Sequence, residues 1–173
     1  MSFIGVICDT KNENYIKQIL RENLKNKTVI ILKEDNVENF KNIKFETVII
    51  MSNDKTTILN KLKQDEEDFI KKIIDGAKYL VVNADEEINL NLLQETNGKV
   101  ITYGFNSKST VTASSVKEDV VLLCVQRNIE NLEGKNIELQ EFNINKLNSK
   151  IPTNIVMGLA TVLLMYGVED LNI

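Results

Sequence analysis

The segment most similar to a nucleotide-binding motif is the opening one, IGVICDTKNENYIKQIL, from Ile4 to Leu20. This segment predicts a buried strand, a tight turn and an amphipathic helix, which is the order in which a phosphate-binding P-loop is built. A P-loop also needs glycines that turn backbone N–H groups toward the phosphates, a lysine, and a hydroxyl for Mg²⁺. The turn here reads CDTKNEN, so Thr10 and Lys11 occupy a degenerate P-loop position that lacks the glycines.

The charges of this turn disfavour a triphosphate. Asp9 and Glu13 would place carboxylates beside the phosphates, and each such pair repels by several kcal/mol at about 4 Å and an effective dielectric constant of about 20. Thr10 followed three residues later by Glu13 also predicts a capping box at the start of the helix. We therefore interpret the turn as a helix cap, with residual phosphate binding through Lys11 as the alternative.

Other reactive groups are few. The chain has no histidine, which excludes Cys/His nucleophile pairs, histidine zinc sites and imidazole bases. Ser114 and Ser115 consequently lack a histidine partner. The acidic run DEED, residues 65–68, predicts the first turn of a solvated helix rather than a cation site. Cys8 and Cys124 lie in apolar strand-like runs and are expected to be reduced core thiols. We expect no catalytic residue, metal site or cofactor, and weak or absent ATP binding.

Length and composition favour one soluble domain. The 173 residues are 43% apolar, which is enough for one well-packed core. The net charge of −4, with both signs interleaved, gives no field that would attract nucleic acid or a membrane surface. No leader and no apolar run of about 18 residues is present, so we expect a cytoplasmic protein.

Short β-branched runs alternate with helical patterns in the first part of the chain. The expected strands are Phe3–Cys8, Thr28–Leu32, Thr47–Met51, Tyr79–Asn83 and Lys99–Gly104. Their continuous apolar character is typical of a parallel sheet covered by helices on both faces. Apolar spacing predicts the helices near 15–24, 58–62 and 69–74. The fold class is thus α/β, with a Rossmann-like, mostly parallel sheet.

The pattern changes after Gly104. Three strand-like runs follow without a helix between them, which predicts a small antiparallel β meander within 108–150. Residues 151–173 then contain an apolar helix, and the whole chain, 1–173, is expected to form one domain with 1–107 as its parallel part. The helix from Asn154 to Gly167 is apolar nearly all round, so its outer face should meet another chain, as a homodimer or with a separate protein partner. The alternative is that it lies between the parallel sheet and the meander.

Two further segments carry a family resemblance. The segment AKYLVVNADEEINLNLLQETNGKVITYGFNSKSTVTASSV resembles the central, ATP-binding domain of the Mur ligases, in which a strand ends in Asn-Ala-Asp-Asp and a later strand ends in Thr-Tyr-Gly. The segment PTNIVMGLATVLLMYGV is similar to the family's His-Asn-x-x-Asn-x-x-Ala-Ala helix, of which Asn154 and Ala160 remain. The opening turn aligns with the family's P-loop, with its glycines and lysine replaced.

The resemblance implies an ATP-dependent ligase ancestry and a site at the carboxyl end of the sheet. The family asparagine at the position of Asn83 contacts adenine, so Asn83, Asp85 and Asn154 are candidates for a vestigial nucleoside pocket. The alternatives are that Asn83 caps its strand and that Asn154 caps its helix. No family glutamate can be aligned with Glu34, Glu38 or Glu46, and the flanking family domains are expected to be absent.

These observations lead to one preferred function and two alternatives. We expect a Mur-ligase-like central domain that has lost ligase activity and acts as a binding or self-associating module linked to peptidoglycan precursor metabolism. The first alternative is a weak nucleotide-binding regulatory module. The second is a subunit of an ATP-dependent amide ligase that another chain completes.

Overall fold

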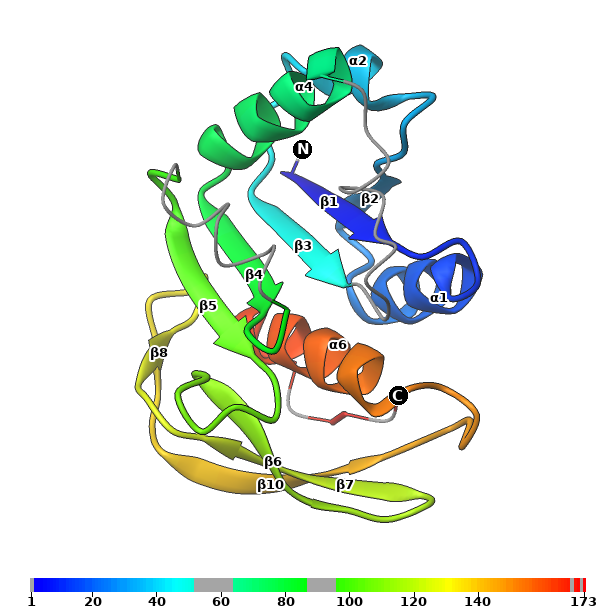
Figure 1. Cartoon of the computed structure of the whole chain (residues 1–173). Coiled ribbons are helices and arrows are strands. Elements are labelled where there is room, and N and C mark those ends of the chain that lie inside the picture. The colour runs from blue at the N-terminus through cyan, green and yellow to red at the C-terminus, as the bar shows by residue number, and fades with distance from the viewer. Residues whose placement is uncertain (1, 52–63, 87–95, 169, 172) are drawn as a thin grey trace.

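The computed structural model describes residues 2–51, 64–86, 96–168, 170, 171 and 173 (Figure 1). The predicted helix near 58–62 lies outside these residues. The helices and strands follow in the order β1 (Ser2–Cys8), α1 (Glu13–Asn23), β2 (Lys27–Ile31), α2 (Val37–Phe40), β3 (Thr47–Met51), α4 (Gln64–Asp75), β4 (Tyr79–Asn83), β5 (Lys99–Tyr103), β6 (Val111–Val116), β7 (Val120–Val125), β8 (Ile129–Glu130), β9 (Asn136–Ile137), β10 (Gln140–Asn145) and α6 (Thr153–Met165).

Eight strands form one sheet in the order β10-β7-β6-β5-β4-β3-β1-β2. Strands β2, β1, β3, β4 and β5 are parallel, and each matches its predicted bounds to within one residue. The predicted antiparallel strands continue this sheet, because β6 pairs with β5, and β7 pairs with both β6 and β10. A separate two-stranded sheet, β8 with β9, branches from the connection between β7 and β10. The α/β, mostly parallel class is confirmed.

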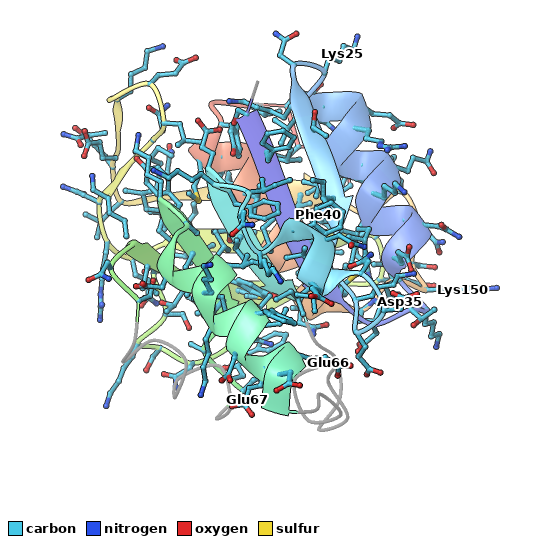
Figure 2. All side chains as sticks on the ribbon, turned by 90° about the horizontal axis from the view of Figure 1, so that it is seen from above. Lys25, Asp35, Phe40, Glu66, Glu67 and Lys150 are labelled. Carbon is cyan, nitrogen blue, oxygen red and sulfur yellow. The ribbon has the colours of Figure 1, made fainter. Side chains whose placement is uncertain are left out.

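Helices cover both faces of the parallel part, which explains why its strands are apolar throughout. In β3, Ile49 and Met51 pack into the core cluster that contains α1 and α6. Val48 and Ile50 point to the opposite face and pack into the cluster that contains α2 and α4. The acidic run 65–68 begins in the first turn of α4, as predicted, and Figure 2 shows Glu66 and Glu67 at that end of the helix.

Helix α6 lies between the parallel strands and the antiparallel strands β6, β7 and β10 (Figure 1). Ten of its residues are buried, on all sides of the helix. The argument that its outer face should meet another chain is therefore wrong, because the curled sheet covers that face within one molecule. The prediction of a homodimer thereby loses the observation on which it rested. None of the helices in the described parts of the chain is long and apolar enough to cross a membrane.

Helix α6 runs antiparallel to β3. Near its C-terminal end, the Tyr166 hydroxyl lies 2.9 Å from Thr47 Oγ1 at the start of β3. Earlier in the helix, Gly158 lies against the end of the Met51 side chain, where β3 ends. The helix N-terminus, with Asn154, therefore lies at the carboxyl edge of the parallel sheet, which is the edge where ligands bind in open α/β sheets.

Candidate functional site at the carboxyl edge of the sheet

The turn between β1 and α1 stands where a P-loop would lie. Thr10 and Lys11 are exposed, and Asn12, which is 4% exposed, precedes the first helical residue. The backbone N–H of Asn12 donates to the Asp9 carbonyl oxygen at 3.1 Å. This amide is therefore used inside the turn, whereas a P-loop turns such donors toward the phosphates.

The predicted capping box does not form. Helix α1 begins at Glu13, so Thr10 lies before the helix instead of at its N-cap, and the N-cap residue Asn12 makes no capping bond with its side chain. The Glu13 carboxylate instead pairs with Lys33 Nζ at 2.6 Å. Lys33 follows β2, which lies beside β1 in the sheet, so the tertiary ion pair replaces the local cap.

The field around this turn is negative at the end of β1. The pKa of the Cys8 thiol is raised to about 12, first by burial and then by the carboxylates of Glu13 and Asp9, against the opposing effect of Lys33. The thiol is therefore protonated at neutral pH and is no nucleophile. Cys8 and Cys124 are both free thiols, as the sequence predicts, but only Cys8 is buried in the core and Cys124 is half-buried.

The ends of β4 and β5 are connected through Asp85. Its Oδ2 accepts a hydrogen bond from the Phe105 N–H at 2.7 Å, and its Oδ1 accepts one from the Asn106 N–H at 2.8 Å. A Cβ on Gly104, whose φ is +150°, would lie 2.7 Å from the Asp85 carboxylate. Asn83, which is 2% exposed, accepts the Asp85 N–H at 3.0 Å through Oδ1. Its predicted role as a strand cap is confirmed.

Asn154 is the second residue of α6 and is half-buried. The N-cap position belongs to Pro152, so the interpretation of Asn154 as the N-cap is wrong. Asn83, Asp85 and Asn154 all lie at the carboxyl edge, but the Asp85 oxygens are engaged by backbone N–H groups. The nucleoside pocket stays a prediction. In the described residues, no three Cys, Asp or Glu side chains gather in a way that would hold a metal ion.

A second polar cluster, at the opposite edge of the sheet, has no signal in the sequence. Glu46 Oε2 accepts hydrogen bonds from Lys27 Nζ at 2.8 Å, from the Tyr166 hydroxyl at 3.0 Å and from the Ser2 hydroxyl. Burial alone would raise the pKa of Glu46, but these hydrogen bonds outweigh it and lower that pKa. Glu46 and Tyr166 are 120 residues apart, so no local pattern predicts their contact.

Comparison with known proteins shows the fold. No protein-family model matches the sequence, and no curated protein matches it significantly. A pseudomurein peptide ligase type C from Methanothermus fervidus is similar in structure, with a TM-score of 0.65 at 14% identity over 97% of this chain. The UDP-N-acetylmuramate:L-alanyl-gamma-D-glutamyl-meso-diaminopimelate ligase from Neisseria meningitides has a TM-score of 0.62 at 9% identity over 96% of this chain.

The chain spans 47% of the first of these structures and 62% of the second. At such low identity the similarity establishes the fold alone. The chain therefore has a Mur-ligase-like α/β fold, and the resemblance seen in the segments around Asn83 and Asn154 is confirmed at the level of the fold.

Proposed function

We propose that this Mur-ligase-like domain is a non-catalytic binding module that has lost the phosphate half of its nucleotide site. The observation that supports this proposal most directly is the turn between β1 and α1. The Asn12 amide is bonded within the turn, and Glu13 stands at the first position of α1. A carboxylate at this position stabilises the positive end of the helix dipole, which a phosphate would otherwise occupy.

Loss of phosphate binding would remove most of the catalysis. Phosphoryl transfer depends on positioning the γ-phosphate and neutralising its charge, and the protein supplies little other chemistry. Lys11 is the cation nearest to the expected position in sequence, and it is exposed on a turn without glycines. We infer that the domain neither hydrolyses ATP nor forms an amide bond.

A steady-state assay of phosphate release from ATP with Mg²⁺ tests this inference. The protein should release no more phosphate than buffer does. Release above buffer that disappears in a Lys11→Ala variant would overturn the proposal, since it would show that the turn still serves a triphosphate. Lys25→Ala, which changes an exposed lysine in the loop before β2, is the matched control.

We further propose that the partner of this module belongs to peptidoglycan precursor metabolism. The support is the fold shared with two ligases, one for a pseudomurein peptide and one for UDP-N-acetylmuramate. Co-purification of a tagged copy from its own cells, with the bound proteins identified by mass spectrometry, tests this link. Recovery only of proteins unrelated to the cell wall would contradict it.

A further inference from the structure

Strand β5 has a different neighbour on each side. On one side it pairs with β4 along its whole length, from Tyr79↔Lys99 to Asn83↔Tyr103. On the other side it pairs with β6 at a single position, Tyr103↔Val111. Within the described chain, the first half of β5 therefore has no strand partner on that side, although β5 is an interior strand by its place in the sheet.

The backbone of Val100 faces this open side. The Lys99 N–H donates to the Lys78 carbonyl at 3.0 Å, and the Ala84 N–H donates to the Tyr103 carbonyl at 2.8 Å. The odd-numbered residues of β5 thus direct their backbone groups toward β4. Since backbone groups alternate in direction along a strand, the N–H and C=O of Val100 point to the opposite edge. An unpaired edge of this kind is a template for an added strand.

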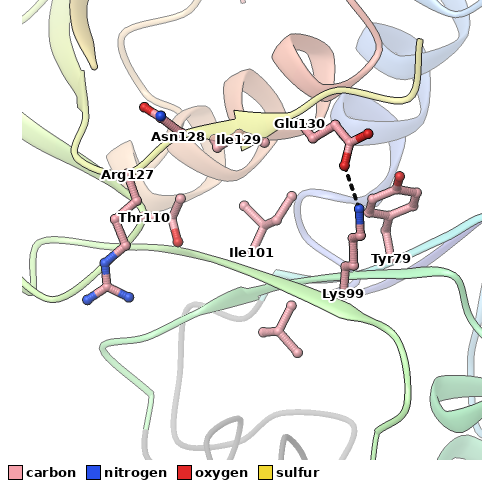
Figure 3. Close-up of a pocket in the computed structure, with 9 residues that line it drawn as sticks. Tyr79, Lys99, Ile101, Thr110, Arg127, Asn128, Ile129 and Glu130 are labelled. Carbon is pink, nitrogen blue, oxygen red and sulfur yellow. Dashed lines mark hydrogen bonds and ion pairs between the residues drawn. The ribbon is translucent and has the colours of Figure 1, made fainter. Parts of the chain in front are cut away.

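A cavity of about 410 Å³ lies along the same edge, between β5 and the segment 127–130 (Figure 3). Thr110 closes one end of this slot, because its N–H donates to Thr102 Oγ1 at 2.9 Å and its carbonyl accepts the Gln126 N–H at 2.8 Å. Ile101 and Ile129, both less than 10% exposed, form an apolar wall.

The other end of the slot is spanned by an ion pair. Lys99 Nζ lies 2.7 Å from Glu130 Oε2, and more than half of each side chain is exposed. Figure 3 marks this pair with a dashed line. An exposed pair of this kind contributes little stability, about 0–1 kcal/mol, so it opens readily. The slot is thus firmly closed at one end only.

Charge at the slot is positive, in contrast to the net charge of −4 of the whole chain. Lys78 and Lys99 both lie over the Tyr79 ring, and Arg127 lines the slot. Within the described residues no ion pair to Arg127 is present. Among the described residues that line the slot, Lys99 and Arg127 are the cations and Glu130 is the one carboxylate, so the local charge favours a negatively charged occupant.

We propose that this slot binds an extended, acidic segment of a partner protein, which adds to β5 as a short strand. Backbone hydrogen bonds to Val100 would supply the pairing, and Lys99 and Arg127 would select carboxylates. The open edge from Lys99 to Ile101 spans about 10 Å at 3.3 Å per residue, which suits a short segment. This inference names the partner chemistry of the binding module and rests on that proposed role.

The test is a titration with the acetylated peptide Thr-Val-Glu-Val-Glu, followed in ¹H–¹⁵N NMR correlation spectra of the protein. The amides of residues 99–101 and 127–130 should shift, with the largest downfield change at Val100. A peptide with lysine for glutamate tests the charge, and one that is N-methylated at the third residue, which keeps both carboxylates, tests the backbone pairing. Neither peptide should change the chemical shifts of these amides. Arg127→Gln should weaken binding about threefold to fivefold, because the contact is exposed. Arg21→Gln, on the surface of α1, is the matched control.

Several outcomes would overturn the proposal that this slot binds an acidic strand. Equal binding of the N-methylated peptide would exclude strand addition, and chemical-shift changes confined to other residues would exclude this site. If the acidic peptide caused no chemical-shift change, an acidic segment would be excluded as the occupant. Shifts at the same amides that grow with protein concentration alone would show that a second copy of this chain fills the slot. Because phosphate release is measured separately, ATP hydrolysis would overturn the proposed function and leave the result on the slot standing.

Discussion

Replacing Gly158 by alanine should destabilise the protein, although alanine is the better helix former. In the interior of an unhindered helix, this exchange stabilises by about 1 kcal/mol. In α6, however, a Cβ at this position would lie 2.8 Å from Tyr103 Cζ, 3.0 Å from its hydroxyl oxygen and 3.1 Å from Met51 Cε. Helix and sheet approach so closely here that only a glycine fits without movement.

The surroundings have little room to adjust. Tyr103 is fully buried, and its hydroxyl donates to the Ile50 carbonyl at 3.2 Å. Overpacking of this kind costs about 1–3 kcal/mol. Displacing the hydroxyl from its partner costs about 1 kcal/mol more. After the gain in helix propensity, the free energy of unfolding should fall by about 1–3 kcal/mol. For a chain of this length, the midpoint temperature should fall by about 3–10 °C.

Urea denaturation of a double-mutant cycle measures this effect. In a Tyr103→Leu background the ring is gone, so Gly158→Ala should be neutral or stabilising there. A Gly158→Ala protein at least as stable as the parent would refute the close packing of α6 on β5. An equal penalty in both backgrounds would show that the strain comes from some other contact.

Further predictions concern the two polar clusters and the oligomeric state. Asp85→Ala should lower the free energy of unfolding by about 1–2 kcal/mol, since it removes the acceptor for the Phe105 and Asn106 amides, and an unchanged urea midpoint would contradict this. Glu46→Gln should cost about 1–2 kcal/mol at neutral pH. Because the folded-state pKa of Glu46 is lowered, its contribution to the free energy of unfolding is present above the ordinary value of 4.5 and is lost as pH falls through the folded pKa. A difference in this free energy between parent and variant that persists in acid would contradict the prediction. Light scattering at micromolar concentration should give a monomer mass, because α6 is buried within one chain, and a concentration-independent dimer would show a different interface.

The parallel half of the fold could be predicted because its signal is local. Runs such as those from Thr47 to Met51 and from Tyr79 to Asn83 are apolar throughout, which only a sheet covered on both faces explains. The strand-capping role of Asn83 also follows from a bond to a residue only two positions away. The contacts of the apolar strands follow from the fold class, and the hydrogen bond of Asn83 follows from a neighbouring residue.

The remaining features depend on contacts that are distant in sequence. The Thr10 capping box failed because Glu13 bonds to Lys33, which β2 brings alongside the turn. The apolar character of α6 predicted its burial but could not distinguish a partner chain from the antiparallel strands. The open edge of β5 arises because β6 begins only at Val111, opposite the last residue of β5, and no residue of β5 itself signals this.

Isothermal titration calorimetry with ATP and Mg²⁺ tests most directly whether the turn between β1 and α1 has lost the ability to bind a triphosphate. We expect a dissociation constant of about 1 mM or weaker, and adenosine should bind no less tightly than ATP, because the phosphates gain nothing from this turn. Micromolar binding of ATP that is lost with adenosine and reduced by Lys11→Ala would contradict the account.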